Sequence, residues 1–524
     1  MPEHSDGRRA ARKIFVTKPC REHQKMDKNV FLIPKKVVSV VKTLENKGFE
    51  AYLIGGCTRD LILGRKPKDW DVTTNATPKE IISTFPDTFY ENDYGTVGVE
   101  FKDTEDETLK YVEVTPYRLE AKYSDNRHPD TVTFSKNLEE DLKRRDFTIN
   151  AIAIKLQKEI EENEYETEIV DLFEGQKDLK EKIIKTVGEP EDRFNEDALR
   201  ILRAIRLSAE LGFEIDQKTE EAIKKLAKNL ENIAKERIRD EFAKIVMSDM
   251  PWEGLKMAEE FGVLPYIMPE LAKGKGVIQG GEHIYDVWEH TLRAVQHSAD
   301  KKMPLEVRLA VLLHDIGKPK TARPAPEKEK WTFYGHEVVG AKIAEKALNN
   351  LKFPKKVIEK VSKLVRWHMF FSDTEQITLS AVRRLLAKVG HENIWDLINV
   401  RISDRIGMGR PKEEPYRLRK YQSMIEEVMR DPVSVGMLKI DGNGIMETLK
   451  CQPGPKIGFI LNALLQEVLD NPGKNTEEYM QKRVMELDKL PEKELKKLGE
   501  EGKERKEKEE EKDIGEIRKK YYVK

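Results

Sequence analysis

Residues 53–74 read LIGGCTRDLILGRKPKDWDVTT, and this stretch decides the fold of the first part of the chain. It predicts a buried strand ending in two glycines, a short helix, and a strand that carries Asp69 and Asp71. Positions i and i+2 of a strand point to the same face. Two neighbouring carboxylates repel each other unless a cation lies between them, and Mg²⁺, which prefers oxygen ligands, is the natural occupant. Glu113, in the predicted strand YVEVTPY, is the best candidate for a third acidic ligand.

The residues around these aspartates suit a nucleoside triphosphate. Gly55 and Gly56 let backbone amides approach phosphate groups closely. Arg59 follows at the start of a predicted helix, whose N-terminus favours phosphate. Two metal ions held by the acidic residues can activate a hydroxyl nucleophile and stabilise a departing pyrophosphate. Taken singly these features are weak, because Asp-x-Asp is more often a solvated strand face and Gly-Gly is usually only a turn.

The combined pattern GG-x-x-RD-x-x-LG-x-x-x-x-D-x-D is far more specific. It resembles the signature of the polymerase-β-type nucleotidyltransferase superfamily, in the branch of bacterial (class II) CCA-adding tRNA nucleotidyltransferases and poly(A) polymerases. Thr58 stands where that family commonly has valine, and this departure leaves the acidic and glycine positions intact.

The resemblance implies addition of nucleotides to RNA 3′ ends, with tRNA, CTP and ATP as partners and Mg²⁺ as cofactor of this first domain. It implies that Asp69 and Asp71 are catalytic and hold magnesium, and Glu113 is the predicted third catalytic residue. The nucleotide-binding residues predicted from this pattern and from the segments below are Gly55, Gly56, Arg59, Arg144, Asp146, Asn150, Asp197, Arg200, Arg203 and Arg206.

Three further segments support this interpretation. One of them, ERIRDEFAKIV, which contains Glu236 and Arg237, resembles a family helix that supports the nucleotide pocket. In RRDFTINA, residues 144–151, the adjacent arginines suit phosphate or ribose contacts, although a surface salt bridge is an equal alternative. In RFNEDALRILRAIRLSAELGF, Asp197 and Arg200 are spaced i, i+3 and are expected to share one helix face. Such a pair is usually an ordinary surface bridge, but the resemblance implies that both residues read the incoming base. Arg203 and Arg206 continue a basic stripe that could meet the RNA backbone.

The resemblance also favours one substrate over others. The polar stretch at residues 123–130 matches the position of a flexible loop that the family needs for the final adenosine, which argues against an enzyme adding only cytidines. Residues 440–472 resemble the family's tRNA-binding tail. Lys456 there could bind RNA backbone, with a simple turn and helix cap as an equal alternative.

A second chemistry is indicated between residues 282 and 410. Histidines and aspartates recur there in the order H…HD…H…H…D, which resembles the HD phosphohydrolase superfamily. The resemblance implies that this set binds one or two divalent metals that activate water against phosphoesters, with Mn²⁺, Ni²⁺, Mg²⁺ and Fe²⁺ left open. It suggests phosphatase or 2′,3′-cyclic phosphodiesterase activity on RNA ends. His283 and His297 are interpreted as bystanders. The predicted ligands are His290, His314, Asp315, His336, His368 and Asp404.

Composition sets few limits on function. The 524 residues include 94 basic and 95 acidic side chains, so net charge alone does not indicate a nucleic-acid binder. No apolar run of about 18 residues predicts a membrane span, and no apolar stretch at the start resembles a secretion signal. The three cysteines are widely separated, which predicts neither a zinc site nor a disulfide framework and favours a cytoplasmic location.

The predicted fold class is α+β, with a polymerase-β-like α/β head followed by all-α neck, HD and tail domains. The expected parts are a basic extension (1–28), the head (29–187), the neck (188–275), the HD domain (276–411), the tail (412–495) and a charged extension (496–524). The predicted function is CCA addition to tRNA. A poly(A) polymerase and an adenosine-only tRNA enzyme are alternatives within the family, and an HD hydrolase with a nucleotide-binding head is the alternative of a different class.

Overall fold

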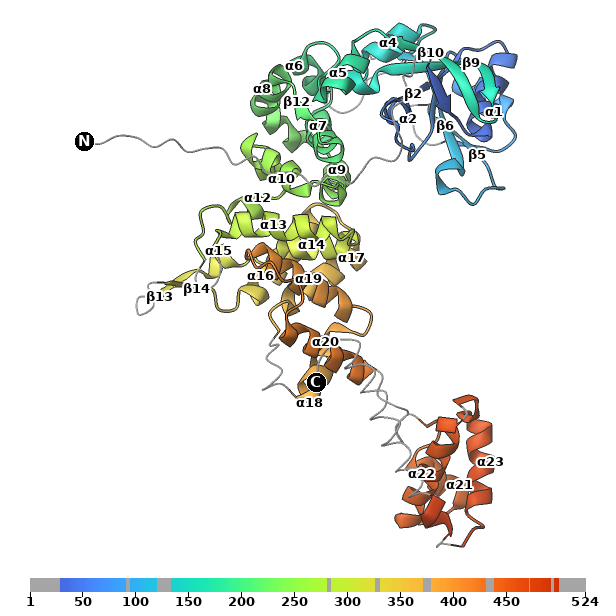
Figure 1. Cartoon of the computed structure of the whole chain (residues 1–524), viewed down its shortest axis with the longest axis vertical. Helices are drawn as coiled ribbons and strands as arrows, with labels where there is room; N and C mark the ends of the chain where they lie inside the picture. The colour runs from blue at the N-terminus through green and yellow to red at the C-terminus, as the bar shows by residue number, and fades with distance from the viewer. Residues whose placement is uncertain are drawn as a thin grey trace, which may run out of the picture. The chain divides into compact units, whose positions relative to one another are not determined.

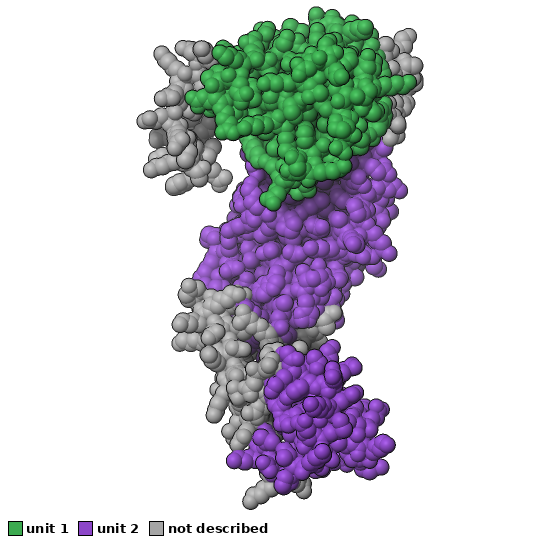
Figure 2. Space-filling view, turned by 90° about the vertical axis from the view of Figure 1, so that its right-hand side faces the viewer, with its two compact units in different colours: residues 1–196 green, residues 197–524 purple. Residues whose placement is uncertain are grey.

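The computed structural model describes residues 29–90, 95–119, 133–279, 284–325, 330–370, 378–429, 438–470, 472–491 and 494–498. The chain divides into two compact units, residues 1–196 and 197–524 (Figure 2). Among the described residues, none of the helices combines the length and the apolar character that crossing a bilayer requires.

The first unit is built on one eight-stranded mixed sheet, coloured blue to teal in Figure 1. Only the pair β3 and β6 is parallel, and the other neighbours run antiparallel. In order across the sheet the strands are β1 (Val30–Leu32), β10 (Glu164–Asp171), β9 (Ile152–Glu161), β2 (Ala51–Ile54), β3 (Asp71–Thr74), β6 (Tyr111–Pro116), β5 (Val97–Glu100) and β4 (Thr88–Tyr90).

Alternation along β3 and β6 separates an apolar face of the sheet from a polar one. Val72, Val112 and Val114 lie in the main core of the unit together with the apolar stripe of α1 (Lys35–Asn46). Because successive side chains of a strand point to opposite faces, Asp71 and Glu113 lie on the other face. The remaining helices of this unit are α2 (Gly56–Ile62), α3 (Pro78–Thr84), α4 (Leu138–Lys143), α5 (Gly175–Glu181) and α6 (Pro190–Glu196).

The second unit is almost entirely helical, as expected, and also contains the two-residue strand β12 (Glu214–Ile215) and one short hairpin. Its first helices are α7 (Leu199–Leu211), α8 (Gln217–Leu226), α9 (Lys235–Met247), α10 (Pro251–Glu260), α11 (Leu264–Ile267) and α12 (Pro269–Ala272). Next come α13 (Val287–Asp300), α14 (Leu305–Leu313), α15 (Lys318–Thr321), α16 (His336–Asn350), α17 (Lys355–Trp367), α18 (Leu379–Val389), α19 (Ile394–Gly407) and α20 (Tyr416–Met429). Strands β13 (Arg323–Ala325) and β14 (Lys330–Thr332) form the hairpin between α15 and α16.

Helix packing in the middle of this unit brings distant segments together. Helix α13 packs against α14 and α19, and α14 also packs against α17 (Figure 1). After α20, which packs against α18, the helices α21 (Gly442–Leu449), α22 (Pro455–Asp470) and α23 (Glu477–Leu487) enclose an apolar core of their own.

Candidate functional site

Two carboxylates lie side by side on the polar face of the first sheet. Asp71 is the first residue of β3 and is in register with Glu113 of the parallel strand β6. The Glu113 amide donates a hydrogen bond to the Trp70 carbonyl at 3.0 Å. Trp70 is 3% exposed and belongs to the main core, so it anchors the chain between the two aspartates. The paired strands therefore hold Asp71 and Glu113 at one level of the sheet.

The expectation that Asp69 lies on the strand is wrong. Strand β3 begins at Asp71, and Asp69 lies in a bend two residues earlier. Strand pairing with β2 and β6 starts only after the buried Trp70, so Asp69 is held by the turn that precedes the sheet. Its carboxylate nevertheless lies close to Gly56, because a methyl group on Gly56 would come within 3.6 Å of Asp69 Oδ1.

The two glycines approach both aspartates and two arginines. A methyl group built on Gly55 would lie 3.0 Å from Asp71 Oδ2 and 3.5 Å from Arg145 Nη1. A methyl group on Gly56 would lie 3.6 Å from Asp69 Oδ1 and 3.7 Å from Arg59 Nη2. Gly55 also has φ 79° and ψ −135°, a backbone conformation that only glycine adopts readily. The sequence-predicted residues at this end of the head therefore converge.

A hydrogen-bonded chain connects Arg59 to the segment 144–151. Arg59 Nη1 donates to Asn150 Oδ1 at 3.0 Å, and Asn150 Nδ2 donates to Asp146 Oδ1 at 3.3 Å. Arg59 Nε also donates to Asp60 Oδ1 at 2.9 Å. Asp146 and Asn150 are buried, which leaves Arg59 fixed in place on the glycine side. The structure thus brings together three of the predicted nucleotide-binding residues.

Thr58, the departure from the family pattern, is accommodated by the backbone. Its buried hydroxyl lies 2.9 Å from the Gly55 carbonyl and 3.0 Å from the Ile152 carbonyl, to which it can donate. A buried hydroxyl with acceptors in reach avoids the cost of an unsatisfied polar group. Threonine in place of valine therefore leaves the glycine turn undisturbed.

Asp141, which the sequence did not single out, positions the two adjacent arginines. Its Oδ1 accepts from Arg144 Nη2 at 2.6 Å, and its Oδ2 accepts from Arg145 Nη2 at 3.3 Å. Burial disfavours the charged carboxylate, yet Arg144 and Arg145 hold the pKa of Asp141 below its usual range. Thr73 of β3 also donates to Asp141 Oδ2, at 3.3 Å. The spacing i, i+3 and i, i+4 in LEEDLKRR was the signal available in the sequence.

Asp141→Asn is expected to weaken binding of a phosphate-bearing ligand at the two arginines by about tenfold, because both lose the anion that orients them. The folded-state pKa of Asp141 is depressed, so its contribution to stability is present above about pH 5 and is lost as pH falls through the folded value. The loss of stability in the variant should therefore be larger at pH 7 than at about pH 3, which lies below the unfolded pKa of an aspartate. Thermal unfolding followed at both pH values checks this, and an equal deficit at both would contradict it.

In the second unit, Asp197 pairs with a partner that the sequence spacing did not indicate. Helix α7 begins at Leu199, so Asp197 precedes it and does not share a helix face with Arg200. Its Oδ2 accepts from Arg237 Nη2 of α9 at 2.7 Å, and its Oδ1 accepts from the Leu199 amide at 3.0 Å. Arg200 lies on α7 and is 8% exposed.

The expected basic stripe on α7 is largely engaged within the fold. Arg206 has a side chain only 12% exposed, and its Nε lies 3.3 Å from Glu241 Oε2. Arg203 is more exposed, at 34%, and its Nη1 lies 4.0 Å from Glu241 Oε1. Arg203 is thus the better placed of the two to meet a phosphate.

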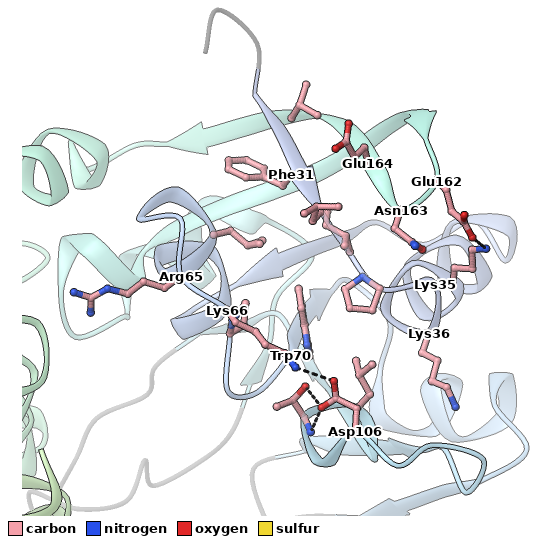
Figure 3. A pocket seen from close by; sticks show the side chains of 18 of the residues that line it. Phe31, Lys35, Lys36, Arg65, Lys66, Trp70, Asp106, Glu162, Asn163 and Glu164 are labelled. Carbon is pink, nitrogen blue, oxygen red and sulfur yellow. Dashed lines mark hydrogen bonds and ion pairs between the residues drawn. The ribbon is translucent and has the colours of Figure 1, made fainter. Parts of the chain in front are cut away.

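The first unit also contains a separate cavity of about 870 Å³ (Figure 3). Trp70 lines it, but Asp69 and Asp71 do not. Lys66 Nζ, which donates to Asp106 Oδ2 at 2.9 Å, closes one edge of it. This cavity is therefore distinct from the site formed by the two aspartates.

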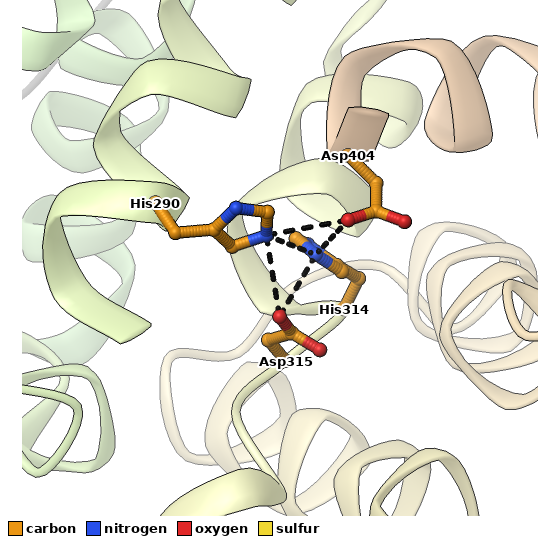
Figure 4. A group of neighbouring side chains, drawn as sticks. All are labelled: His290, His314, Asp315 and Asp404. Atoms are coloured by element: carbon orange, nitrogen blue, oxygen red, sulfur yellow. Dashed lines mark hydrogen bonds and ion pairs between the residues drawn. The ribbon is translucent and has the colours of Figure 1, made fainter. Parts of the chain in front are cut away.

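All six predicted residues of the HD set meet in the second unit. The atoms that could bind a metal form two groups, and both groups contain Asp315. Within each group these atoms all lie within 4.8 Å of one another. Figure 4 shows the first of these groups. Both His290 Nε2 and His314 Nε2 lie 3.2 Å from Asp315 Oδ2. The first group is His290, His314, Asp315 and Asp404, and the second is Asp315, His336 and His368. The head carboxylates Asp69, Asp71 and Glu113 are not such a group within the part of the chain that is described.

Backbone carbonyls orient three of these imidazoles. Nδ1 of His314, His336 and His368 lies 2.7, 2.8 and 2.7 Å from a carbonyl three residues upstream. Donation from Nδ1 leaves the Nε2 lone pair facing the cluster, the arrangement that metal-ligating histidines use. His336 Nε2 lies 3.4 Å from the second carboxylate oxygen of Asp315. Asp315 thus presents one oxygen to each group.

Electrostatics within this cluster favour bound cations. Burial opposes charge on Asp315, but His314 and Lys318 hold the pKa of this carboxyl well below its usual range. Burial lowers the pKa of His314, but Asp315 and Asp404 outweigh it and raise the value to about 10. Burial, with His314 nearby, lowers the pKa of His368 to about 3. The anions that favour a proton on His314 would equally favour a metal ion.

A cavity of about 510 Å³ opens directly over this cluster. Asp315, His336, His368 and Asp404 line its floor, together with cationic Lys318 and Arg401. His297 lies elsewhere, with Nδ1 3.1 Å from Ser403 Oγ.

Two expectations from the sequence are not tested by these residues. The loop at 123–130 and His283 lie outside the described part of the chain. In the tail, Lys456 Nζ pairs with Asp488 Oδ1 at 2.6 Å.

Three protein-family models match the chain. Residues 51–185 match a poly A polymerase head domain, residues 212–275 match a probable RNA and SrmB-binding site of polymerase A, and residues 281–408 match an HD domain.

Similar curated proteins come from several bacteria. A CC-adding tRNA nucleotidyltransferase of Thermus thermophilus is 34% identical over 425 residues, which cover 80% of this chain and 89% of that protein. A CCA-adding enzyme of Leuconostoc mesenteroides is 40% identical over 50% of this chain and 63% of its own length. The chain thus spans less than two thirds of that relative. An A-adding tRNA nucleotidyltransferase of Deinococcus radiodurans is 32% identical over 64% of this chain and 76% of its own length.

Among solved structures, the CCA-adding enzyme of Bacillus stearothermophilus in complex with CTP is similar. It is 28% identical, with a TM-score of 0.56 over 87% of this chain and 97% of that one.

Proposed function

This chain belongs to the tRNA nucleotidyltransferase and poly(A) polymerase family, and on that premise we propose that it adds CMP, CMP and AMP to the 3′ end of tRNA from CTP and ATP. The observation that carries the proposal is the convergence of two aspartates on the Gly55–Gly56 turn, where a methyl group on Gly55 would touch Asp71 and one on Gly56 would touch Asp69. The solved relative with CTP supports the choice of nucleotide.

The head residues divide into acidic and phosphate-binding roles. Asp69, Asp71 and Glu113 offer only carboxylate oxygens, the donor set that Mg²⁺ prefers. Bound magnesium would activate the 3′ hydroxyl and stabilise the departing pyrophosphate. The strand register keeps Asp71 and Glu113 adjacent on one face of the sheet.

Phosphate binding falls to the glycine turn and the arginines beside it. Gly55 and Gly56 leave room for the triphosphate against the backbone, because any side chain would fill that space. Arg59, held by Asn150, and Arg145, held by Asp141, supply positive charge at the same place. We assign base selection to Asp197 and Arg200, with Arg237 orienting the Asp197 carboxylate.

The number of nucleotides added separates the members of this family. The Thermus relative is a CC-adding enzyme and the Deinococcus relative is an A-adding one. The polar stretch at 123–130, which resembles the loop needed for the last adenosine, favours complete CCA addition in this chain.

The HD cluster supports a second activity. The two groups joined by Asp315 would hold one or two divalent ions, Mn²⁺, Ni²⁺, Mg²⁺ or Fe²⁺, which supply a water nucleophile for phosphoester hydrolysis. Lys318 and Arg401 line the cavity above and would bind the phosphate. The proposed reaction is removal of a phosphate or opening of a 2′,3′-cyclic phosphate at an RNA end.

The decisive experiment measures incorporation of labelled CTP and ATP, separately and together, into tRNA ending before CCA, tRNA ending in CC, and an unrelated RNA. Two cytidines followed by one adenosine, confined to tRNA, are expected. Cytidines alone would identify a CC-adding enzyme, adenosine only on tRNA-CC would identify an A-adding one, and long tails on any RNA would identify a poly(A) polymerase. No incorporation would leave the HD cluster as the main activity.

A further inference from the structure

Exposed aromatic side chains stand at the mouth of the cavity over the HD cluster. The consecutive residues 331–334 all line this cavity. Trp331 is 45% exposed and Tyr334 is 85% exposed. Aromatic faces left open to solvent beside a polar cavity provide surfaces on which a nucleobase can stack. We call Trp331 and Tyr334 the aromatic rim.

The backbone ties the aromatic rim to the metal-ligand set. Gly335, with φ 76°, turns the chain between Tyr334 and the buried His336 at the start of α16. The carbonyl of Phe333 lies 2.8 Å from His336 Nδ1 and fixes that ring. Two residues span at most about 7 Å, so the backbone of Tyr334 lies close to His336 of the metal-ligand set.

Two cationic side chains, Lys318 and Arg401, also line the cavity. Lys318 Nζ lies 2.6 Å from Asp315 Oδ2 and contacts Gln279, which leaves it a third N–H to donate. Arg401 Nη1 donates to Asp404 Oδ2 at 2.7 Å, and a guanidinium has four further N–H groups. Lys318 and Arg401 therefore lie beside the carboxylates that are predicted to bind metal, where they could also bind a phosphate oxygen.

We propose, resting on the phosphohydrolase activity proposed above, that the HD cavity selects nucleotides through their base, which stacks on Trp331 and Tyr334 while Lys318 and Arg401 bind the phosphate. The substrate class is a nucleoside 2′,3′-cyclic phosphate, at an RNA end or as the mononucleotide. Its hydrolysis consumes one water: a phosphorus–oxygen bond forms to that water, the bond from phosphorus to one ribose oxygen breaks, and that oxygen takes a proton from the water.

The test compares substrates with and without a base. Wild type and Trp331→Ala/Tyr334→Ala, each loaded with the same divalent metal, are assayed on adenosine 2′,3′-cyclic phosphate and on glycerol 1,2-cyclic phosphate. The double variant is expected to lose about tenfold or more in kcat/KM on the nucleotide, mainly through KM, and nothing on the glycerol substrate. Tyr334→Phe, which keeps the ring, should retain wild-type KM. Tyr416→Ala, an exposed tyrosine of α20, is the matched control.

The remaining outcomes separate this inference from the activity on which it rests. Equal losses on both substrates, or none on either, would overturn the stacking role while leaving the hydrolase intact. A short RNA ending in a cyclic phosphate, assayed beside the mononucleotide, shows which source is preferred. If wild type hydrolyses neither substrate with any metal, the proposed hydrolase fails. In that case, binding of AMP is measured by calorimetry in wild type and in the double variant. Weaker binding in the double variant supports base stacking on the aromatic rim, and unchanged binding overturns it.

Discussion

Nucleotide incorporation into tRNA is expected to fall by on the order of 10³-fold or more in Asp71→Asn, because a metal ligand worth several kcal/mol in the transition state is lost. Asparagine has nearly the same shape, and Asp71 is only partly buried at the start of β3, so strand pairing with Glu113 should survive. Asp69→Asn should show a similar loss. Rates of CTP incorporation at saturating tRNA measure both.

The matched control for this change is Glu105→Gln, which neutralises an exposed carboxylate of the same unit outside the acidic face. Its incorporation rate should equal that of wild type. Hydrolysis by the HD cluster should be unchanged in Asp71→Asn, since the two sets of residues belong to different units. Near-normal incorporation by Asp71→Asn would remove Asp71 from the catalytic set.

Phosphoester hydrolysis and bound metal should both be lost in Asp315→Asn, with activity reduced on the order of 10³-fold or more. Asp315 is the member shared by both groups of the HD cluster, and each of its oxygens lies near a different histidine set. Asparagine removes the charge and offers a weaker ligand to both groups at once. Metal content by elemental analysis and hydrolysis of a cyclic phosphate provide two independent readouts.

His336→Asn removes a ligand from one group only, so it should lower the metal content less than Asp315→Asn does. His391→Asn, at an exposed histidine, is the control and should keep full metal content. Nucleotide incorporation should be unchanged in all three variants. Full metal content in Asp315→Asn would contradict the assignment of this cluster as a metal centre.

The two-residue periodicity of the sequence was sufficient to predict that Asp71 and Glu113 share the polar face of the sheet in the head. The two-residue alternation of VEVTP and DVTT places valines in the core and Asp71 and Glu113 opposite, and the structure has this arrangement. The parallel pairing of β3 with β6 joins segments about 40 residues apart, and no local pattern specifies that register. The bend at Asp69 also escaped prediction, because burial of Trp70 determines where strand pairing can start.

Contacts between segments far apart in the sequence account for the other differences between the predictions and the structure. The sequence spacing offered Arg200 as the neighbour of Asp197, but α7 starts two residues later and α9 supplies Arg237 instead. The packing of α7 against α9 decides that contact, and spacing along one helix cannot show it. The HD set was found through its order along the chain, whereas the sharing of Asp315 by two groups follows only from how the helices pack.

Trp70 gives the head a built-in optical reporter. It is the only tryptophan in residues 1–196, and its backbone lies directly between Asp69 and Asp71. Its indole is buried, and its N–H has no hydrogen-bond partner among the described residues, so its emission is sensitive to small changes around the ring. A protein with the other five tryptophans replaced by phenylalanine would therefore let arrival of magnesium and nucleotide at the acidic face be followed by fluorescence in real time.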